Sequence, residues 1–276
     1  MSFLRYPLTW MFGGILVLVL AYQLVALPAG SNRTAVYVLA VVGAAVAVTL
    51  YWLIMHFVAA RKVPELAART AVPQALLGIA TGLVFIGVSS LVVAALGGYR
   101  FEWTPQHAGA VVAPTIVAAV AAGVVEELVF RGLALQAIEK LAGSWIALAA
   151  TSVFFGLAHL GNPGATIWGA IAIAIEAGVL LGAAFLWRRS LWFVIGLHFA
   201  WNTAEGLLGI PVSGNTVSGL FTVTSSGPDI LTGGAFGLEA SIVPVIVSLF
   251  LAVPMLLLAK RAGHIVAFPR GTKSVA

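Results

Sequence analysis

Long apolar runs dominate the chain, and short polar or charged stretches separate them. A run of about 20 apolar residues can cross the roughly 30 Å of hydrocarbon in a bilayer as one helix. Pro, Gly and pairs of basic residues mark where such runs end. The pattern predicts eight membrane-spanning helices, at about 10–27, 35–60, 74–96, 110–139, 145–160, 165–187, 191–208 and 242–259.

Two polar segments between these runs are predicted to lie outside the hydrocarbon. Residues 100–105 carry aromatic and charged side chains together, which is typical of an interfacial loop with aromatic anchors. Residues 212–240 form a polar loop rich in Gly, Ser and Thr, which could partly re-enter the membrane. We therefore expect a single integral membrane domain over residues 1–276.

The composition agrees with this pattern. Of 276 residues, 61% are hydrophobic and 8% are charged, and the mean hydropathy is +1.08. These values exclude an ordinary soluble domain and predict an all-α, polytopic membrane helix bundle. The absence of cysteine excludes disulfides, thiol catalysis and Cys-ligated metals.

The net charge of +5 does not indicate a nucleic-acid partner, because no basic patch with interleaved aromatic residues occurs. In a membrane protein, a positive net charge is explained by an excess of Lys and Arg in the cytoplasmic loops. With eight spans and the N-terminus inside, only Arg33 and Arg100 fall outside. The positive-inside rule then predicts both termini in the cytoplasm and an inner or plasma membrane location. The inner basic residues are Arg5, Arg61, Lys62, Arg69, Lys140, Arg188, Arg189, Lys260, Arg261, Arg270 and Lys273.

Two pairs of glycines are spaced four residues apart within the spans. They are Gly78 with Gly82 and Gly178 with Gly182. Small residues at this spacing let helix backbones approach closely in a membrane. We expect both pairs to mark helix-packing contacts.

Three charged residues lie close together inside the fourth apolar run. A charge at the bilayer centre costs about 2.5 to 3.5 kcal/mol on insertion scales, so these residues need partners or a function. Glu127 and Arg131 are four residues apart and lie on one helix face, within reach of a salt bridge. Glu126 projects about 100° away around the helix. We expect Arg131 to neutralise Glu127 and to leave Glu126 free.

Further polar side chains fall in the later spans. His159 ends the fifth span, and the seventh contains His198 and Asn202 at a spacing of four, with Glu205 on the same face. Glu176 stands alone in the sixth span, where it is expected to be a helix-packing or cavity group.

A carboxylate pair, two histidines and an amide form the composition of a hydrolytic site. A glutamate beside a histidine can hold and deprotonate a water, and a histidine with an asparagine can donate hydrogen bonds to an oxyanion. Alternatively, Glu126, His159 and His198 could hold Zn²⁺ with an open position. The sequence leaves both alternatives open.

Other chemistries of intramembrane proteolysis are excluded. No His-Glu-x-x-His zinc helix and no Gly-x-Ser-Gly motif occurs. Asp229 is the only aspartate, so an aspartyl dyad cannot form.

Three motifs, in this order, resemble those of the CAAX-protease and bacteriocin-processing (CPBP, or ABI) family. They are Glu126-Glu127-x-x-x-Arg131, Phe155-x-x-x-His159 and His198-x-x-x-Asn202. The family includes the type II CAAX prenyl endopeptidases, and the similarity covers about residues 110–208. The glycine-rich segment at 227–239 also resembles one that is common in bacterial members.

The resemblance implies an intramembrane endopeptidase with an eight-helix core. By motif position, Glu126 would be the general base on the catalytic water, which His159 would help to hold. His198 and Asn202 would form the oxyanion site.

The resemblance also implies supporting roles for Glu127, Arg131 and Phe155. Family members are commonly classed as metalloproteases, whereas archaeal relatives favour a metal-independent glutamate mechanism. The implied partners are the lipid bilayer and a peptide or protein substrate at the membrane, which could be lipidated and of the CAAX type.

Two other functions use the same residues. In a proton- or ion-coupled transporter the glutamates and histidines would relay protons, although internal repeats typical of transporters are absent. A catalytically idle membrane scaffold would bind a partner through residues 212–240. Convergence of Glu126, His159, His198 and Asn202 within about one water of each other favours the protease.

Overall fold

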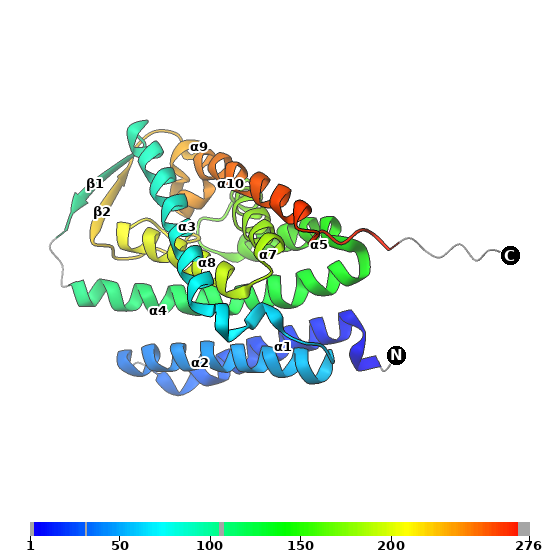
Figure 1. Ribbon diagram of the computed structural model, residues 1–276. Coiled ribbons are helices and arrows are strands. Elements are labelled where there is room, and N and C mark those ends of the chain that lie inside the picture. Colours follow the sequence, from blue (N-terminus) through cyan, green and yellow to red (C-terminus); the bar gives the residue numbers. More distant parts are fainter. Residues whose placement is uncertain (1–2, 31, 105–107, 270–276) are drawn as a thin grey trace.

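The computed structural model describes residues 3–30, 32–104 and 108–269, and nearly all of the regular structure in them is helical. The helices follow the apolar runs of the sequence (Figure 1). Their bounds are α1 Pro7–Ala26, α2 Arg33–Leu53, α3 Ala68–Ala95, α4 Ala108–Glu127, α5 Gln136–Ala158, α6 Ile167–Ile173, α7 Gly182–Arg188, α8 Leu191–Leu208, α9 Asp229–Thr232 and α10 Ile242–Arg261.

Three π-helical segments join or extend these helices. They are η3 (Ile54–Val58) after α2, η5 (Leu128–Leu135) between α4 and α5, and η7 (Ala174–Leu181) between α6 and α7. π-Helical turns are rare and frequently occur at functional sites. Segment η5 begins directly after the glutamate pair, at the place where the sequence concentrates its intramembrane charge.

Six helices in the described residues are long and apolar enough to cross a membrane. They are Pro7–Val25, Arg33–Val58, Ala68–Ala95, Ala108–Gly161, Ile167–Arg188 and Ile242–Arg261. The 54-residue helix breaks at Gly143 (φ 81°), so it contains both the fourth and the fifth expected spans. The seventh expected span corresponds to α8, which is not among the six.

The predicted class is therefore confirmed, and the count of eight spans is approximately matched. The chain is an integral membrane protein built as a polytopic helix bundle.

The glycine pairs mark close helix contacts, as predicted. A Cβ added to Gly78 would lie 2.0 Å from the carbonyl oxygen of Phe193 on α8. One added to Gly178 would lie 2.6 Å from Cα of Ser152 on α5. The second glycine of each pair packs about as closely. A Cβ on Gly82 would lie 2.4 Å from the carbonyl oxygen of Leu197, and one on Gly182 would lie 2.3 Å from Cδ1 of Leu148. These contacts hold α8 against α3 and η7 against α5.

The segment predicted as an interfacial loop is instead a strand. Strand β1 (Tyr99–Trp103) pairs antiparallel with β2 (Phe221–Ser225), which lies in the polar segment at 212–240. Both strands alternate aromatic or β-branched residues with polar ones, a pattern that favours a half-buried sheet. Cross-strand aromatic contacts add to the pairing, as between Trp103 and Phe221, whose ring centroids are 5.2 Å apart. The end of the predicted loop, Pro105, lies outside the described residues.

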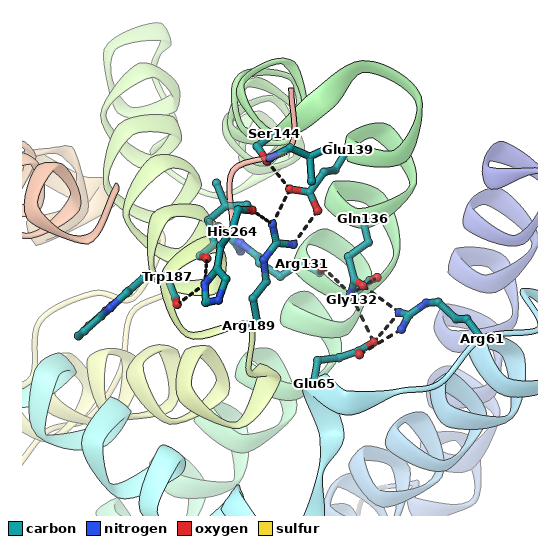
Figure 2. Close-up of polar contacts among 12 residues, drawn as sticks. Arg61, Glu65, Arg131, Gly132, Gln136, Glu139, Ser144, Trp187, Arg189 and His264 are labelled. Atoms are coloured by element: carbon teal, nitrogen blue, oxygen red, sulfur yellow. Dashed lines mark hydrogen bonds and ion pairs between the residues drawn. The ribbon is translucent and has the colours of Figure 1, made fainter. Parts of the chain in front are cut away.

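Polar networks tie the helices together at one end of the bundle (Figure 2). Arg61 donates hydrogen bonds to Glu65 at 2.5 Å and to Gln136 at 2.8 Å. Arg189 pairs with Glu139 at 2.6 Å and also donates to the carbonyl of His264. These contacts fasten the loop after α2, the start of α5 and the segment after α10 to one another.

Candidate active site

The glutamate pair is divided as the helix geometry predicts. Arg131 Nη1 lies 2.9 Å from Oε1 of Glu127, and both side chains are buried. Arg131 also donates to the backbone carbonyl of Ala177 in η7. The prediction that Arg131 pairs with Glu127 is confirmed. The same guanidinium lies 5.0 Å from the ring centroid of Phe155, so it packs against the second motif as well.

Glu127 has a second partner that the sequence did not indicate. His198 Nδ1 on α8 lies 2.8 Å from the same oxygen, Oε1 of Glu127. Because an ionised carboxylate can only accept, Nδ1 carries the proton in this contact. Glu127 therefore links Arg131 to His198 and fixes the orientation of the imidazole, with its Nε2 directed elsewhere.

Glu126 is left free of this network. Its side chain is half-buried, and its Oε2 is buried with no hydrogen-bond partner in the described part of the chain. A buried polar oxygen without a partner is costly unless water or a ligand supplies the hydrogen bond. Glu126 lines two adjoining cavities, which gives this oxygen access to such a partner.

The smaller cavity brings the four predicted catalytic residues together. Its volume available to the centre of a water molecule is about 20 Å³. A cavity needs about 10–15 Å³, measured in this way, to hold one water. The residues that line it are Glu126, Phe155, His159, Ile173, Ala177, His198, Trp201, Asn202, Ser213 and Glu239.

A wider pocket of about 400 Å³, here called the mouth, shares part of this lining. Its wall is polar. It includes the side-chain amides of Asn162 and Asn215, in addition to the motif residues Glu126, His159 and Asn202. No lysine or arginine occurs among the described residues that line it. These residues are Ala122, Glu126, Phe130, Ala158, His159, Asn162, Asn202, Val212, Ser213 and Asn215.

His159 is placed by the helix that precedes it. Helix α5 ends at Ala158, and the ring of His159 stacks on Phe155 one turn earlier, with centroids 4.6 Å apart. Nδ1 of His159 lies 2.8 Å from the Phe155 carbonyl oxygen, which can only accept. Nδ1 therefore donates, and in the neutral ring Nε2 is an acceptor. Phe155 therefore contacts His159 through both its ring and its backbone carbonyl.

The three residues considered as zinc ligands line one cavity but do not form a metal site as arranged. Within the described chain, no group of three or more His, Asp or Glu side chains is positioned to hold a metal ion. Nδ1 of each histidine is hydrogen-bonded, so Nε2 is the ring nitrogen that remains for another partner. The metalloprotease alternative is not supported by this arrangement, and the steps proposed below involve no metal.

Glu239 is a cavity residue that sequence reasoning did not assign. It is buried, and its Oε2 accepts the backbone N–H of Ser213 at 2.6 Å. Burial raises the pKa of Glu239, while the Ser213 N–H and the nearby histidines act in the opposite direction. Ser213 has a positive φ of 47°, which is rare for a non-glycine residue. The only signal in the sequence was that Glu239 lies in the glycine-rich segment.

The carboxylates of Glu205 and Glu176, noted above in the later spans, are buried but line neither cavity. Glu205 shares the helix face of His198 and Asn202, as predicted, but does not line either cavity. Glu176 lies in η7 and is fully buried. The carboxyl oxygens of Glu176 and Glu205 have no hydrogen-bond partner among the described residues.

Fold and site together define a polytopic helical membrane protein with a polar cavity between α4, α5 and α8. Residues 108–204 match the family model described as Type II CAAX prenyl endopeptidase Rce1-like. This segment contains all three motifs, so the match confirms the resemblance and supports a CAAX-type intramembrane protease in general terms. Comparisons with curated proteins and with solved structures found no match.

Proposed function

We propose that this protein is an intramembrane endopeptidase that uses a glutamate-activated water. Its substrates are membrane-associated or lipidated peptides. The observation that supports this proposal best is the convergence of Glu126, His159, His198 and Asn202 on a cavity with room for about one water. The free Oε2 of Glu126 gives that water a base.

In the proposed reaction, the oxygen of the water attacks the scissile carbonyl carbon, and Glu126 accepts a proton from the water at the same time. The acceptor Nε2 of His159 holds the second hydrogen of the water. Glu126 then passes the proton to the leaving amine, and the C–N bond breaks. Positioned acid–base groups of this kind contribute about 10² to 10⁴ in rate.

The carbonyl oxygen becomes negatively charged during the attack. The donors that stabilise it are the amide nitrogen of Asn202 and the Nε2–H of His198, which acts as an imidazolium while its Nδ1–H is held by the Glu127 carboxylate. Glu127 and Arg131 act on this step through His198, because the Glu127 carboxylate holds the ring at 2.8 Å. Loss of one such donor typically reduces kcat by about 10² to 10³.

The lining of the mouth favours cleavage of internal peptide bonds. Recognition of a C-terminal carboxylate usually requires a cation. Among the described residues the mouth offers amides, which can pair with a peptide backbone, and no lysine or arginine. These groups suit an endopeptidase, with its catalytic core at about 110–208, better than a carboxypeptidase, which would need a cation for the terminal carboxylate.

The test is cleavage of fluorogenic peptides by purified protein in lipid nanodiscs. The peptides would carry a farnesylated CAAX end, a single acyl chain or no lipid. Glu126→Gln should reduce kcat at least 100-fold, and the exposed Glu102→Gln, which removes an equal charge, should leave it unchanged. Activity that survives chelation would support the metal-independent mechanism.

Three outcomes would contradict the proposed mechanism or favour an alternative function. Equal cleavage by wild type and Glu126→Gln contradicts the proposed base. Absence of cleavage of every peptide, together with proton or ion flux that depends on Glu126, would indicate a transporter. Absence of both activities would leave a membrane scaffold.

A further inference from the structure

The two ends of the helix bundle differ strongly in charge. At the end shown in Figure 2, the polar networks bring together the loop after α2, the bend between α4 and α5, the end of α7 and the segment after α10. We call this the basic end. Its described cations are Arg61, Lys62, Arg69, Lys140, Arg188, Arg189, Lys260 and Arg261, and its carboxylates are Glu65 and Glu139.

The opposite end, here called the loop end, consists of residues 96–104, 159–166 and 209–240. Hydrogen bonds join these segments, including Asn162 Nδ2 to the Ser213 carbonyl at 2.9 Å and Ser226 N to the Gly98 carbonyl at 2.9 Å. The strands β1 and β2 belong to it (Figure 1). The formal charges of these segments are one cation and three carboxylates, namely Arg100, Glu102, Asp229 and Glu239. Arg33, at the start of α2, is the other cation that the sequence places on this side.

The mouth belongs to the loop end. Asn162, Val212, Ser213 and Asn215 form part of its wall, and Asn215 is exposed. A separate pocket of about 360 Å³ at the basic end is lined by Arg61, Gln136 and Lys140 among others, and it shares no lining residue with the mouth.

Packed side chains separate these two pockets. Segment η5 runs from Glu127 toward the basic end, and its residues Leu128, Leu133 and Leu135 are fully buried. The Arg131 guanidinium is also buried and is bonded to η7. A peptide that approaches from the basic end therefore meets closed protein before it reaches Glu126.

Short loops rich in Lys and Arg remain on the cytoplasmic side of a membrane. This rule places the basic end in the cytoplasm and the loop end on the opposite side. We infer that the mouth opens on the non-cytoplasmic side, so that the enzyme receives membrane-anchored peptides from that face. Cytoplasmic prenylated tails would then lie on the wrong side of the bilayer. The side on which the mouth opens is inferred from geometry and charge alone. That a peptide substrate enters there rests on the proposed function.

The absence of cysteine makes the orientation directly measurable. Thr216→Cys introduces a thiol at an exposed position beside the mouth, and Lys140→Cys introduces one at the basic end. Spheroplasts of a bacterial host expressing each variant would be treated with a membrane-impermeant maleimide. Thr216→Cys should be labelled at least ten-fold more than Lys140→Cys, and permeabilisation should remove the difference. The reverse labelling pattern would overturn the inference.

A second experiment adds the substrate. A fluorogenic peptide that carries one palmitoyl chain would be added to intact spheroplasts or to inverted membrane vesicles. We expect cleavage in spheroplasts that Glu126→Gln abolishes. Cleavage confined to inverted vesicles overturns the inference and leaves the proposed function intact. Absence of cleavage in both preparations contradicts the proposed function, and the labelling pattern still decides the orientation of the mouth.

Discussion

Removal of one member of the Glu127–Arg131 pair should destabilise the bundle far more than removal of both. The pair is 2.9 Å apart, with 0% and 1% of the two side chains exposed. Arg131→Met leaves the Glu127 carboxylate buried with only His198 as a partner, and Glu127→Gln leaves the guanidinium without its counter-charge. Breaking a buried ion pair from one side costs about 3–5 kcal/mol.

The double variant Glu127→Gln/Arg131→Met replaces two charges by neutral groups of similar size. Replacement of a whole buried pair is often close to neutral in stability. The double-mutant cycle should therefore give a coupling energy of at least about 2 kcal/mol, within the range for residues in one network. Equilibrium unfolding in mixed SDS micelles would measure the four free energies.

A matched control is the Arg61–Glu65 pair, in which the arginine is 30% exposed. Its coupling should be smaller, because solvent screens a partly exposed charge. Additive effects at Glu127 and Arg131, or single variants that each cost under about 1 kcal/mol, would refute the assigned ion pair. Activity measured in parallel should fall in all three variants, since each disturbs the carboxylate that orients His198.

Three further predictions follow from other contacts. Gly78→Ala should lower the unfolding temperature, because its Cβ would lie 2.0 Å from a backbone oxygen of α8, whereas Gly87→Ala on the same helix has nothing within 4 Å and should be tolerated. Glu239→Ala should raise KM about ten-fold, because the Ser213 N–H loses its acceptor and Ser213 in the wall of the mouth is no longer held in place. Glu239→Gln keeps an acceptor oxygen and should retain most activity. Equal loss in both variants would contradict a positioning role. Burial alone would raise the pKa of Glu65, but hydrogen bonds from Arg61 outweigh it and hold the pKa below its ordinary value. The stabilisation is therefore complete above the ordinary pKa and is lost as pH falls through the lowered one, so Glu65→Gln should flatten the acid limb of a stability-against-pH curve.

Much of the architecture was predictable because a bilayer limits the options. The lengths of the apolar runs predicted the helices, and the glycine pairs predicted two of the contacts between them. The break between the fourth and fifth spans, expected between residues 139 and 145, lies at Gly143 in the long α4–η5–α5 helix. The pairing of β1 with β2 was missed. Their residues are more than 100 positions apart in the sequence, and hydropathy does not report pairing between distant polar segments.

The site was predictable where helix periodicity determines it. The spacing of Glu127 and Arg131 was sufficient to assign their salt bridge and to leave Glu126 free. Contacts between helices were not predictable in this way. Neither the bond from His198 to Glu127 nor the place of Glu239 in the cavity follows from a spacing along the chain, because tertiary packing brings these residues together.

Single-turnover cleavage of the palmitoylated peptide in water enriched in oxygen-18 tests the claim that Glu126 activates a water in the small cavity for peptide hydrolysis. We predict that the new carboxylate carries one solvent oxygen, and that the rate of its incorporation falls at least 100-fold in Glu126→Gln. Incorporation at the same rate in wild type and Glu126→Gln would contradict the claim.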